Sequence, residues 1–268
     1  MLTSGVMRAV RPAARRFKGM LGGTAQPQPI EVHSSADVNP WGLPGLLNHP
    51  DGYLRHRRLA AAIRAEHSSG TLLNVGDPCC QLHGLLPEFE VTSTDLGDAY
   101  LIPPGARFQR ADFTDASAFP ADSFDIVAST DVFEHIPRPR RRDFIEATLR
   151  VARRGAYIAF PAGREAASAE ELIRCSRSRG TFRDALEDHV IHGLPQPGEV
   201  EALLQELGCR YSIEPLTTVV EWLTSFVMCP EDYERPELVM GYWNFLDQTA
   251  PDKVGTGPVY RYLVKVTN

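Results

Sequence analysis

The chain has 268 residues and a formal net charge of −6 at pH 7, and 43% of its residues are hydrophobic. Such a composition is typical of a folded globular protein and excludes a largely disordered, collagen-like or coiled-coil chain. The sequence has no apolar run near the roughly 20 residues that a membrane-spanning helix needs, and its length suits one large domain or one domain with additions.

The first 40 residues differ from the rest of the chain in charge and composition. Residues 1–18 contain five basic side chains and no acid, and residues 22–50 are rich in Gly, Pro, Ser and Asn. We expect residues 1–40 to form a basic, Pro/Gly-rich flexible segment, since Pro12 interrupts any helix there. A helix on an anionic membrane surface and an organellar transit peptide are the alternatives for this segment.

Beyond the basic segment the chain is more acidic than its net charge suggests, which argues against non-specific binding of nucleic acid by the main domain. The five cysteines form no C-x-x-C pair and no disulfide framework, which indicates a reducing compartment. We therefore expect a cytoplasmic protein with no nucleic-acid partner. Peripheral membrane contact through the basic N-terminus is the remaining option for localisation.

Residues 41–268 read as one α/β domain. Helical spacing of apolar residues over 52–67 precedes a series of short apolar or alternating runs. Another amphipathic helix is expected between the last two of these runs, over 139–152. Strands that alternate with helices indicate a mostly parallel sheet with helices on both faces. The expected strands are residues 71–76, 89–95, 124–130 and 155–160.

The second half of the chain adds further helices and two final strands. We expect a helical lid or acceptor-binding insertion over about 161–195, a helix over 198–207, and strands over 210–218 and 258–267. Residues 219–256 between these strands are rich in aromatics. They are the second candidate lid element, although packing is the more frequent role of such a stretch.

Three positions point to a ligand site at the carboxyl ends of the strands. Gly76 ends the first strand, Asp95 ends the second, and Asp112 follows a short third strand. A tight turn after the first strand, followed by an acid roughly 20 residues later, is typical of sites for nucleosides and dinucleotides. Each acid, taken alone, also suits a turn cap. The segment 131–137 (DVFEHIP) directly follows the fourth strand and adds further polar groups.

The order N-V-G, D-L, A-D-F, F-D-I-V and F-E-H-I-P over residues 70–160 resembles the class I S-adenosyl-L-methionine (SAM)-dependent methyltransferases. The resemblance implies a Rossmann-like fold with a mostly parallel seven-stranded sheet, helices on both faces and a helical lid. It also implies SAM as the cofactor and S-adenosyl-L-homocysteine (SAH) as the product.

The resemblance assigns cofactor-binding roles to particular residues of this chain. It implies that Asn74 and Gly76 approach the amino-acid part of SAM and that Asp95 binds the ribose. The other implied contacts are Asp112 and Phe113 at the adenine, Thr130 and Asp131 beneath the sulfonium and methionine, and Glu134 and His135 near the transferred methyl group or in its wall. Leu96, directly after Asp95, is a further expected cofactor contact.

The loop after the first strand departs from the family pattern of an acid followed by Gly-x-Gly-x-Gly. Asn74 replaces the acid, and Pro78 and Cys80 replace the second and third glycines. Pro has no N–H and a fixed φ, so the turn must differ in shape. Asp77 replacing the missing carboxylate, Pro78 starting the next helix early, and loss of SAM binding remain open interpretations.

The predicted activity is methyl transfer to a small-molecule or glycan-type acceptor at oxygen. Candidate general bases are His135, His189 and His192, since a neutral imidazole is available near pH 7. We expect no metal site, because the pair His189 and His192 has no further ligand cluster beside it in the sequence. A catalytically inactive methyltransferase-like scaffold and a nicotinamide-dependent oxidoreductase are the alternative functions.

Overall fold

The computed structural model describes residues 50–99, 102–115, 117–176, 181–228, 243, 245 and 255–267. All of these belong to one unit that spans residues 34–268. The expected N-terminal segment 1–40 and most of the second candidate lid element, 219–256, lie outside the described residues. None of the described helices combines the length and the apolar character needed to cross a bilayer.

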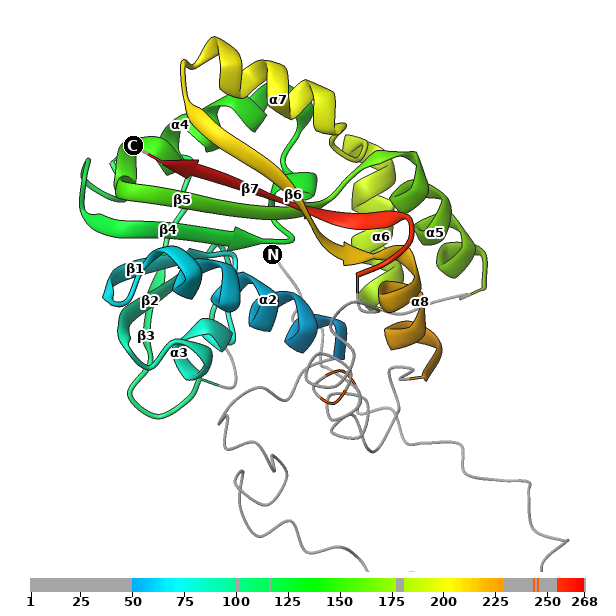
Figure 1. Cartoon of the computed structure of the whole chain (residues 1–268), viewed down its shortest axis with the longest axis horizontal. Helices are drawn as coiled ribbons and strands as arrows, with labels where there is room; N and C mark the ends of the chain where they lie inside the picture. The colour runs from blue at the N-terminus through cyan, green and yellow to red at the C-terminus, as the bar shows by residue number, and fades with distance from the viewer. Residues whose placement is uncertain are drawn as a thin grey trace, which may run out of the picture. The chain divides into compact units, whose positions relative to one another are not determined.

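Seven strands form one sheet in the order β3-β2-β1-β4-β5-β7-β6 (Figure 1). Strands β1 to β5 pair in parallel, and β7 is antiparallel to both β5 and β6. The predicted mostly parallel seven-stranded sheet is therefore confirmed. The strands are β1 (Gly70–Val75), β2 (Phe89–Asp95), β3 (Arg107–Arg110), β4 (Phe124–Thr130), β5 (Ala152–Pro161), β6 (Arg210–Thr218) and β7 (Val259–Thr267).

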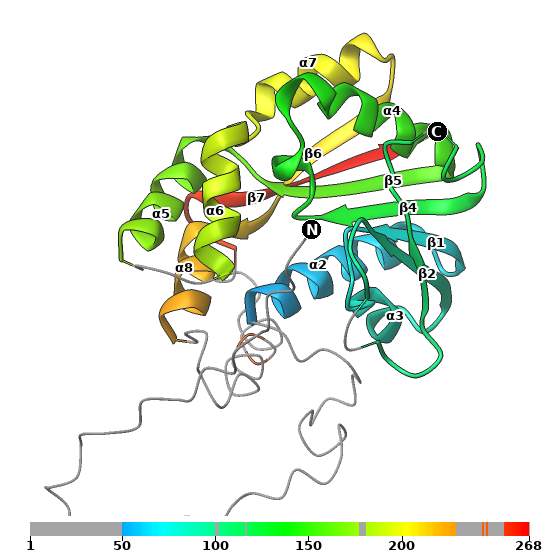
Figure 2. The same cartoon turned by 180° about the vertical axis from the view of Figure 1, so that it is seen from behind.

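Helices cover both faces of the sheet (Figures 1 and 2). On one face lie α2 (Pro50–Glu66) and α3 (Gln81–Leu85), and on the other lie α4 (Arg141–Val151) and α7 (Pro197–Glu206). Successive side chains of a strand point to opposite faces. Leu72 of β1 therefore packs in the core beneath α2 and α3, whereas Leu73 packs in the core beneath α4 and α7.

Three more helices lie together beyond the end of the sheet where β4 ends (Figures 1 and 2). They are α5 (Gly163–Ser176), α6 (Thr181–His192) and α8 (Val219–Met228). The helices share a small apolar core that includes Leu186, Trp222 and Tyr260. The segment expected as a helical insertion, 161–195, thus contains α5 and α6, and the described aromatic residues of α8 pack against them.

The strand order reverses beside β1, which lies between β2 and β4 in the middle of the parallel part. Such a switch point leaves a crevice at the carboxyl ends of the strands, where open α/β sheets bind their ligands. Two short 3-10 helices follow β4 at this edge, η1 (Phe133–His135) and η2 (Arg138–Arg140).

Candidate functional site

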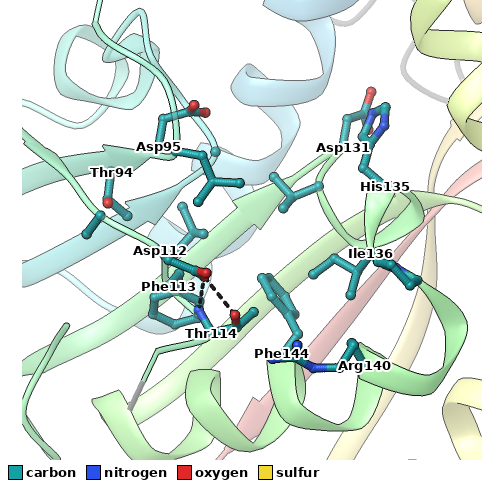
Figure 3. Close-up of a pocket in the computed structure, with 16 residues that line it drawn as sticks. Thr94, Asp95, Asp112, Phe113, Thr114, Asp131, His135, Ile136, Arg140 and Phe144 are labelled. Atoms are coloured by element: carbon teal, nitrogen blue, oxygen red, sulfur yellow. Dashed lines mark hydrogen bonds between the residues drawn. The ribbon is translucent and has the colours of Figure 1, made fainter. Parts of the chain in front are cut away.

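A cavity of about 390 Å³ lies at the carboxyl ends of β1, β2 and β4. Its volume falls within the range of about 300–1,000 Å³ that is usual for small-molecule sites. Asp95 and Asp112 lie on one side of it, and Asp131 and His135 lie on the opposite side (Figure 3). The other expected cofactor-binding residues in its wall are Gly76, Leu96 and Phe113. We call it the smaller cavity.

The carboxylates of Asp95 and Asp112 are both held by local turns. Asp95 Oδ1 accepts the Gly97 N–H at 2.7 Å. Asp112 Oδ1 accepts the Thr114 N–H at 2.9 Å and the Thr114 hydroxyl at 2.7 Å. Each acid therefore caps a turn and lines the cavity at once, with one oxygen committed to the turn.

Gly76 brings the loop after β1 into direct contact with the residue after Asp131. Its φ is +79°, a left-handed conformation that favours glycine. A Cβ at this position would lie 2.0 Å from Cγ2 of Val132. Both Gly76 and Val132 line the smaller cavity. The absence of a side chain at Gly76 therefore lets the loop after β1 and the loop after β4 meet in the cavity wall.

The altered loop is held together by Asp77 from inside. Its carboxylate accepts Asn74 Nδ2 at 2.7 Å, the Cys79 N–H at 3.3 Å and the Gln81 N–H at 2.5 Å. Cys80 adopts a left-handed φ of +53°, and the helix begins at Gln81. The interpretation in which Pro78 starts this helix is therefore wrong, because Asp77 holds residues 78–80 in a turn before it.

The substitutions in this loop leave the smaller cavity open. Pro78 and Cys79 line a second cavity next to it, and Cys80 is fully buried and lines neither cavity. Asn74 and Thr130 are likewise buried at the ends of β1 and β4, outside both walls. Thr94 does line the smaller cavity, and its buried Oγ1 has no hydrogen bond within the described residues. Such an atom at a cavity wall calls for a partner from a ligand.

Asp131 is bound by two arginines. Arg261 donates from Nε to Oδ1 at 2.7 Å and from Nη2 to Oδ2 at 2.6 Å, and Arg55 donates from Nη1 to Oδ2 at 2.6 Å. Arg261 is 1% exposed and also donates to both carboxylate oxygens of Asp51. Burial opposes the charged form, but the two arginines hold the pKa of Asp131 well below its usual range.

A second, larger cavity of about 650 Å³ adjoins the first and shares Gly76, Asp131 and His135 with it. We call it the larger cavity. Glu134 and His189 line it, together with the aromatic residues Trp222, Phe226 and Tyr260. His192, the third expected base, lies in neither wall. The structure therefore brings together two of the three histidines that the sequence singled out.

The two histidines face each other from η1 and α6. Their Nε2 atoms are 3.3 Å apart. Burial lowers the pKa of His135, and the neighbouring His189 lowers it further. Burial also opposes protonation of His189, but the hydrogen bond to Glu170 and the charge of Glu134 outweigh it and raise the pKa of His189. His135 is thus the imidazole that stays neutral near pH 7.

Glu134 is fully buried between these groups. Neither of its carboxyl oxygens has a hydrogen bond within the described residues. Burial raises the pKa of Glu134 to about 8, and the negative charge of Asp131 adds to the rise. Glu134 lines the larger cavity and does not line the smaller one.

A family model described as a methyltransferase domain matches residues 77–160 of this chain. The matched span runs from Asp77 to Phe160 in β5 and includes Asp95, Asp112 and the segment 131–137. This match makes residues 77–160 a methyltransferase domain. The resemblance drawn from the sequence motifs is thereby confirmed.

Solved structures of methyltransferases share the fold. The plantazolicin methyltransferase BpumL, in complex with a triazolic desmethylPZN analog and SAH, is 16% identical over 81% of this chain and 84% of that chain, with a TM-score of 0.51. Phosphoethanolamine N-methyltransferase 2 of Haemonchus contortus, in complex with SAM, is 14% identical over 79% of this chain and 52% of that chain, also at 0.51. Among curated proteins, no relative matches this chain.

Four groups that shape the site of this methyltransferase were not predicted from the sequence. Arg55 and Arg261 bind Asp131, Glu170 binds His189, and the Tyr260 hydroxyl donates to Glu170. Arg261 did carry a signal, because it is a charged residue with apolar and aromatic neighbours in strand β7, where the only other charged residue is Lys265. Such a residue is buried only when it is paired, although the sequence alone does not name the partner, 130 residues away.

Proposed function

We propose that this methyltransferase binds SAM in the smaller cavity and methylates an oxygen of a small-molecule or glycan-type acceptor in the larger cavity. The observation that carries the proposal is the meeting of the two cavities at Gly76, Asp131 and His135. A methyl donor and an acceptor must approach within contact distance in line. Two adjoining cavities with a shared wall provide that arrangement.

The cofactor assignment rests on the walls of the smaller cavity. Asp95 commits Oδ1 to its turn and would accept ribose hydroxyls through Oδ2. Asp112 commits Oδ1 to Thr114 and would accept the adenine amino group in the same way. Phe113 and Phe144 supply apolar walls. Leu96 is 67% exposed and would cover the ribose only once a ligand is present.

Five of the residues expected to bind SAM would act indirectly in this proposal. Asn74 and Asp77 hold the loop that carries Gly76, and Thr130 is buried behind the cavity. Asp131 lines the cavity, but its charge is already balanced by Arg55 and Arg261. It would position the loop after β4, and Glu134 would shape the acceptor side.

Bound SAM supplies an electrophilic methyl group on a positively charged sulfur. The chain would align the acceptor with this group and keep water away from it. His135 has 34% of its side chain exposed, stands at the junction and carries a lowered pKa, so its neutral imidazole would accept the proton of an acceptor hydroxyl. His189 lies behind His135 and would orient it.

The lining of the larger cavity supports the proposed acceptor class. Aromatic side chains of α8 and β7 lie there beside the charged groups of Asp51 and Arg55. Aromatic faces together with charged groups suit a polar ring such as a sugar. The fold alone does not choose the acceptor, because one structural neighbour was solved with a desmethylPZN analog and another is named for phosphoethanolamine.

Calorimetric titration of the full chain with SAM and with SAH tests the proposal. We expect binding of one equivalent of each with micromolar affinity. Loss of the heat signal in Asp95→Ala and Asp112→Ala would then assign the binding to the smaller cavity. Absence of binding in the unmodified chain at high ligand concentration would overturn the proposal and favour the scaffold alternative.

A further inference from the structure

Three potential metal ligands meet in the wall of the larger cavity. Glu134 and His135 belong to η1, and His189 projects from α6. One ligand atom from each side chain lies within 4.8 Å of the others. The sequence pairs His189 with His192, but the fold pairs it with residues that lie more than 50 positions away.

The outer nitrogens of both imidazoles face carboxylates. Nδ1 of His189 lies 3.0 Å from Oε1 of Glu170, which also accepts the Tyr260 hydroxyl at 2.8 Å. Nδ1 of His135 lies 3.7 Å from Oδ2 of Asp188. A carboxylate at one ring nitrogen places the proton there and leaves the other nitrogen as a free ligand, as it does for metal-bound histidines. In the tautomers that carry the proton on Nδ1, both Nε2 atoms would turn their lone pairs toward the same place.

Glu134 adds a carboxyl group at that place, and a bound cation would take the place of its proton. Its side chain is fully buried, and neither carboxyl oxygen has a hydrogen bond within the described residues. Oε1 lies 3.9 Å from His189 Nε2. Buried carboxyl groups are normally hydrogen-bonded, paired or bound to a metal. Two facing imidazole nitrogens and a buried carboxyl group without a hydrogen bond among the described residues together form a set of groups that a cation would satisfy once it displaced their protons.

The spacing of the two imidazole nitrogens fits a single ion, and Oε1 of Glu134, at 3.9 Å from His189 Nε2, would have to approach to complete the set. Two nitrogens bound to one ion at about 2.0–2.1 Å, with tetrahedral to octahedral angles, lie about 2.8–3.4 Å apart. The two Nε2 atoms are 3.3 Å apart. We propose that Glu134, His135 and His189 bind a divalent transition-metal cation such as Zn²⁺, Mn²⁺ or Fe²⁺. Two imidazoles suit these ions, whereas Mg²⁺ and Ca²⁺ prefer all-oxygen sites.

Three protein ligands leave open positions on such an ion. All three line the larger cavity, so these positions face the space assigned to the acceptor. This step rests on the proposed function: the open positions select an acceptor that presents hydroxyl oxygens beside the methyl donor. With the cation bound, His135 would be a ligand and could no longer accept the proton. The cation would lower the pKa of a bound acceptor hydroxyl, which would release its proton to water before its oxygen attacks the methyl group.

Metal titration tests the site without any methyl-transfer assay. The full chain, free of affinity tags and stripped with a chelator, is titrated with Zn²⁺ by calorimetry and with Co²⁺ by visible absorption. We expect one equivalent to bind and Co²⁺ to give visible bands of a nitrogen- and oxygen-ligated ion. His189→Ala and the isosteric Glu134→Gln should each weaken binding roughly 100-fold or more, since even supporting residues around metal sites contribute about 10–100-fold.

The matched control is His192→Ala, one helical turn along α6 and outside both cavities. It should bind Zn²⁺ like the unmodified chain. No bound equivalent in the unmodified chain, or equal losses in His189→Ala, Glu134→Gln and His192→Ala with circular dichroism unchanged, would overturn the inference. A parallel SAM titration separates the two proposals. SAM binding without metal binding would overturn only the metal site, and metal binding without SAM binding would overturn only the proposed function.

Discussion

The two cavities differ in how their walls are held. The Asp95 and Asp112 side of the smaller cavity is fixed by hydrogen bonds to residues two positions along the chain. The wall shared with the larger cavity depends on pairs that are remote in sequence, such as Arg261 with Asp131 and His189 with Glu170. The first wall is formed by the ends of strands and the turns that follow them. The second wall forms only when helices α2 and α6 and strand β7 have packed together.

This difference predicts that changes in the two walls affect different properties, ligand affinity in one case and the stability of the fold in the other. A change in the locally held wall should weaken a ligand and leave the fold intact. A change in the remote pairs should destabilise the protein, because each buried charge there relies on a partner from another element. Four variants test the distinction.

Arg261→Met should have the largest effect. It leaves the buried carboxylates of Asp51 and Asp131 without their main partner, and loss of one member of a buried ion pair costs about 3–5 kcal/mol. The free energy of unfolding, measured by urea titration, should fall by that amount. Arg107→Met removes the exposed pair with Glu90 and should change little. Equal stability of the two variants would contradict the account.

Gly76→Ala should have the next largest effect. The left-handed φ costs a residue with a side chain about 1–2 kcal/mol, and the contact with Val132 adds a comparable overpacking cost. The double variant with Val132→Ala should recover the overpacking part only. Differential scanning calorimetry of the single and double variants measures both. No recovery in the double variant would show that the Val132 contact does not set the cost.

Asp95→Asn should weaken SAM and SAH binding and leave the unfolding transition unchanged. Hydrogen bonds to a charged group contribute about 1.5–3 kcal/mol, which corresponds to roughly 10–100-fold in affinity. Asp98→Asn is the matched control, since Asp98 is an exposed acid nearby that pairs with Arg110 outside the cavity wall. Calorimetry should detect a loss for Asp95→Asn alone. A similar loss in both variants would point to general electrostatics.

The smallest effect concerns acid stability at the α8 side of the larger cavity. Burial opposes the charged form of Glu221, but the hydrogen bonds and charge of Arg58 lower its pKa. A lowered folded-state pKa stabilises the protein above the ordinary Glu pKa, and this contribution is lost as the pH falls through the folded-state value. Thermal unfolding between pH 7 and pH 3 should therefore show a shallower acid-induced loss for Glu221→Gln than for the unmodified chain. Glu90→Gln, in an exposed pair, should leave the slope unchanged.

The sequence predicts the parts of this protein that are set by local patterns. The bounds of β2, β4 and β6 agree with the expected runs, because alternation and β-branched residues mark them. Asp95 and Asp112 are found in the cavity wall for the same reason, since strand ends in a parallel sheet meet at one edge.

The rest depends on contacts that no local pattern encodes. Asp131 looks like a ligand residue in the sequence, yet its partners lie on α2 and β7. His189 and His192 look like one pair, but a helix turn directs only His189 into the larger cavity. The sequence shows that the loop after β1 lacks two of the family's glycines. Only the side-chain geometry shows that the Asp77 carboxylate holds this loop in place through hydrogen bonds.

A crystal structure of the full chain with SAH tests the division between the two cavities most directly. The account predicts the adenosine in the smaller cavity, with ribose hydroxyls on Asp95, the adenine amino group near Asp112 and the sulfur directed toward His135. SAH bound in the larger cavity, or bound without contact to Asp95, would contradict it.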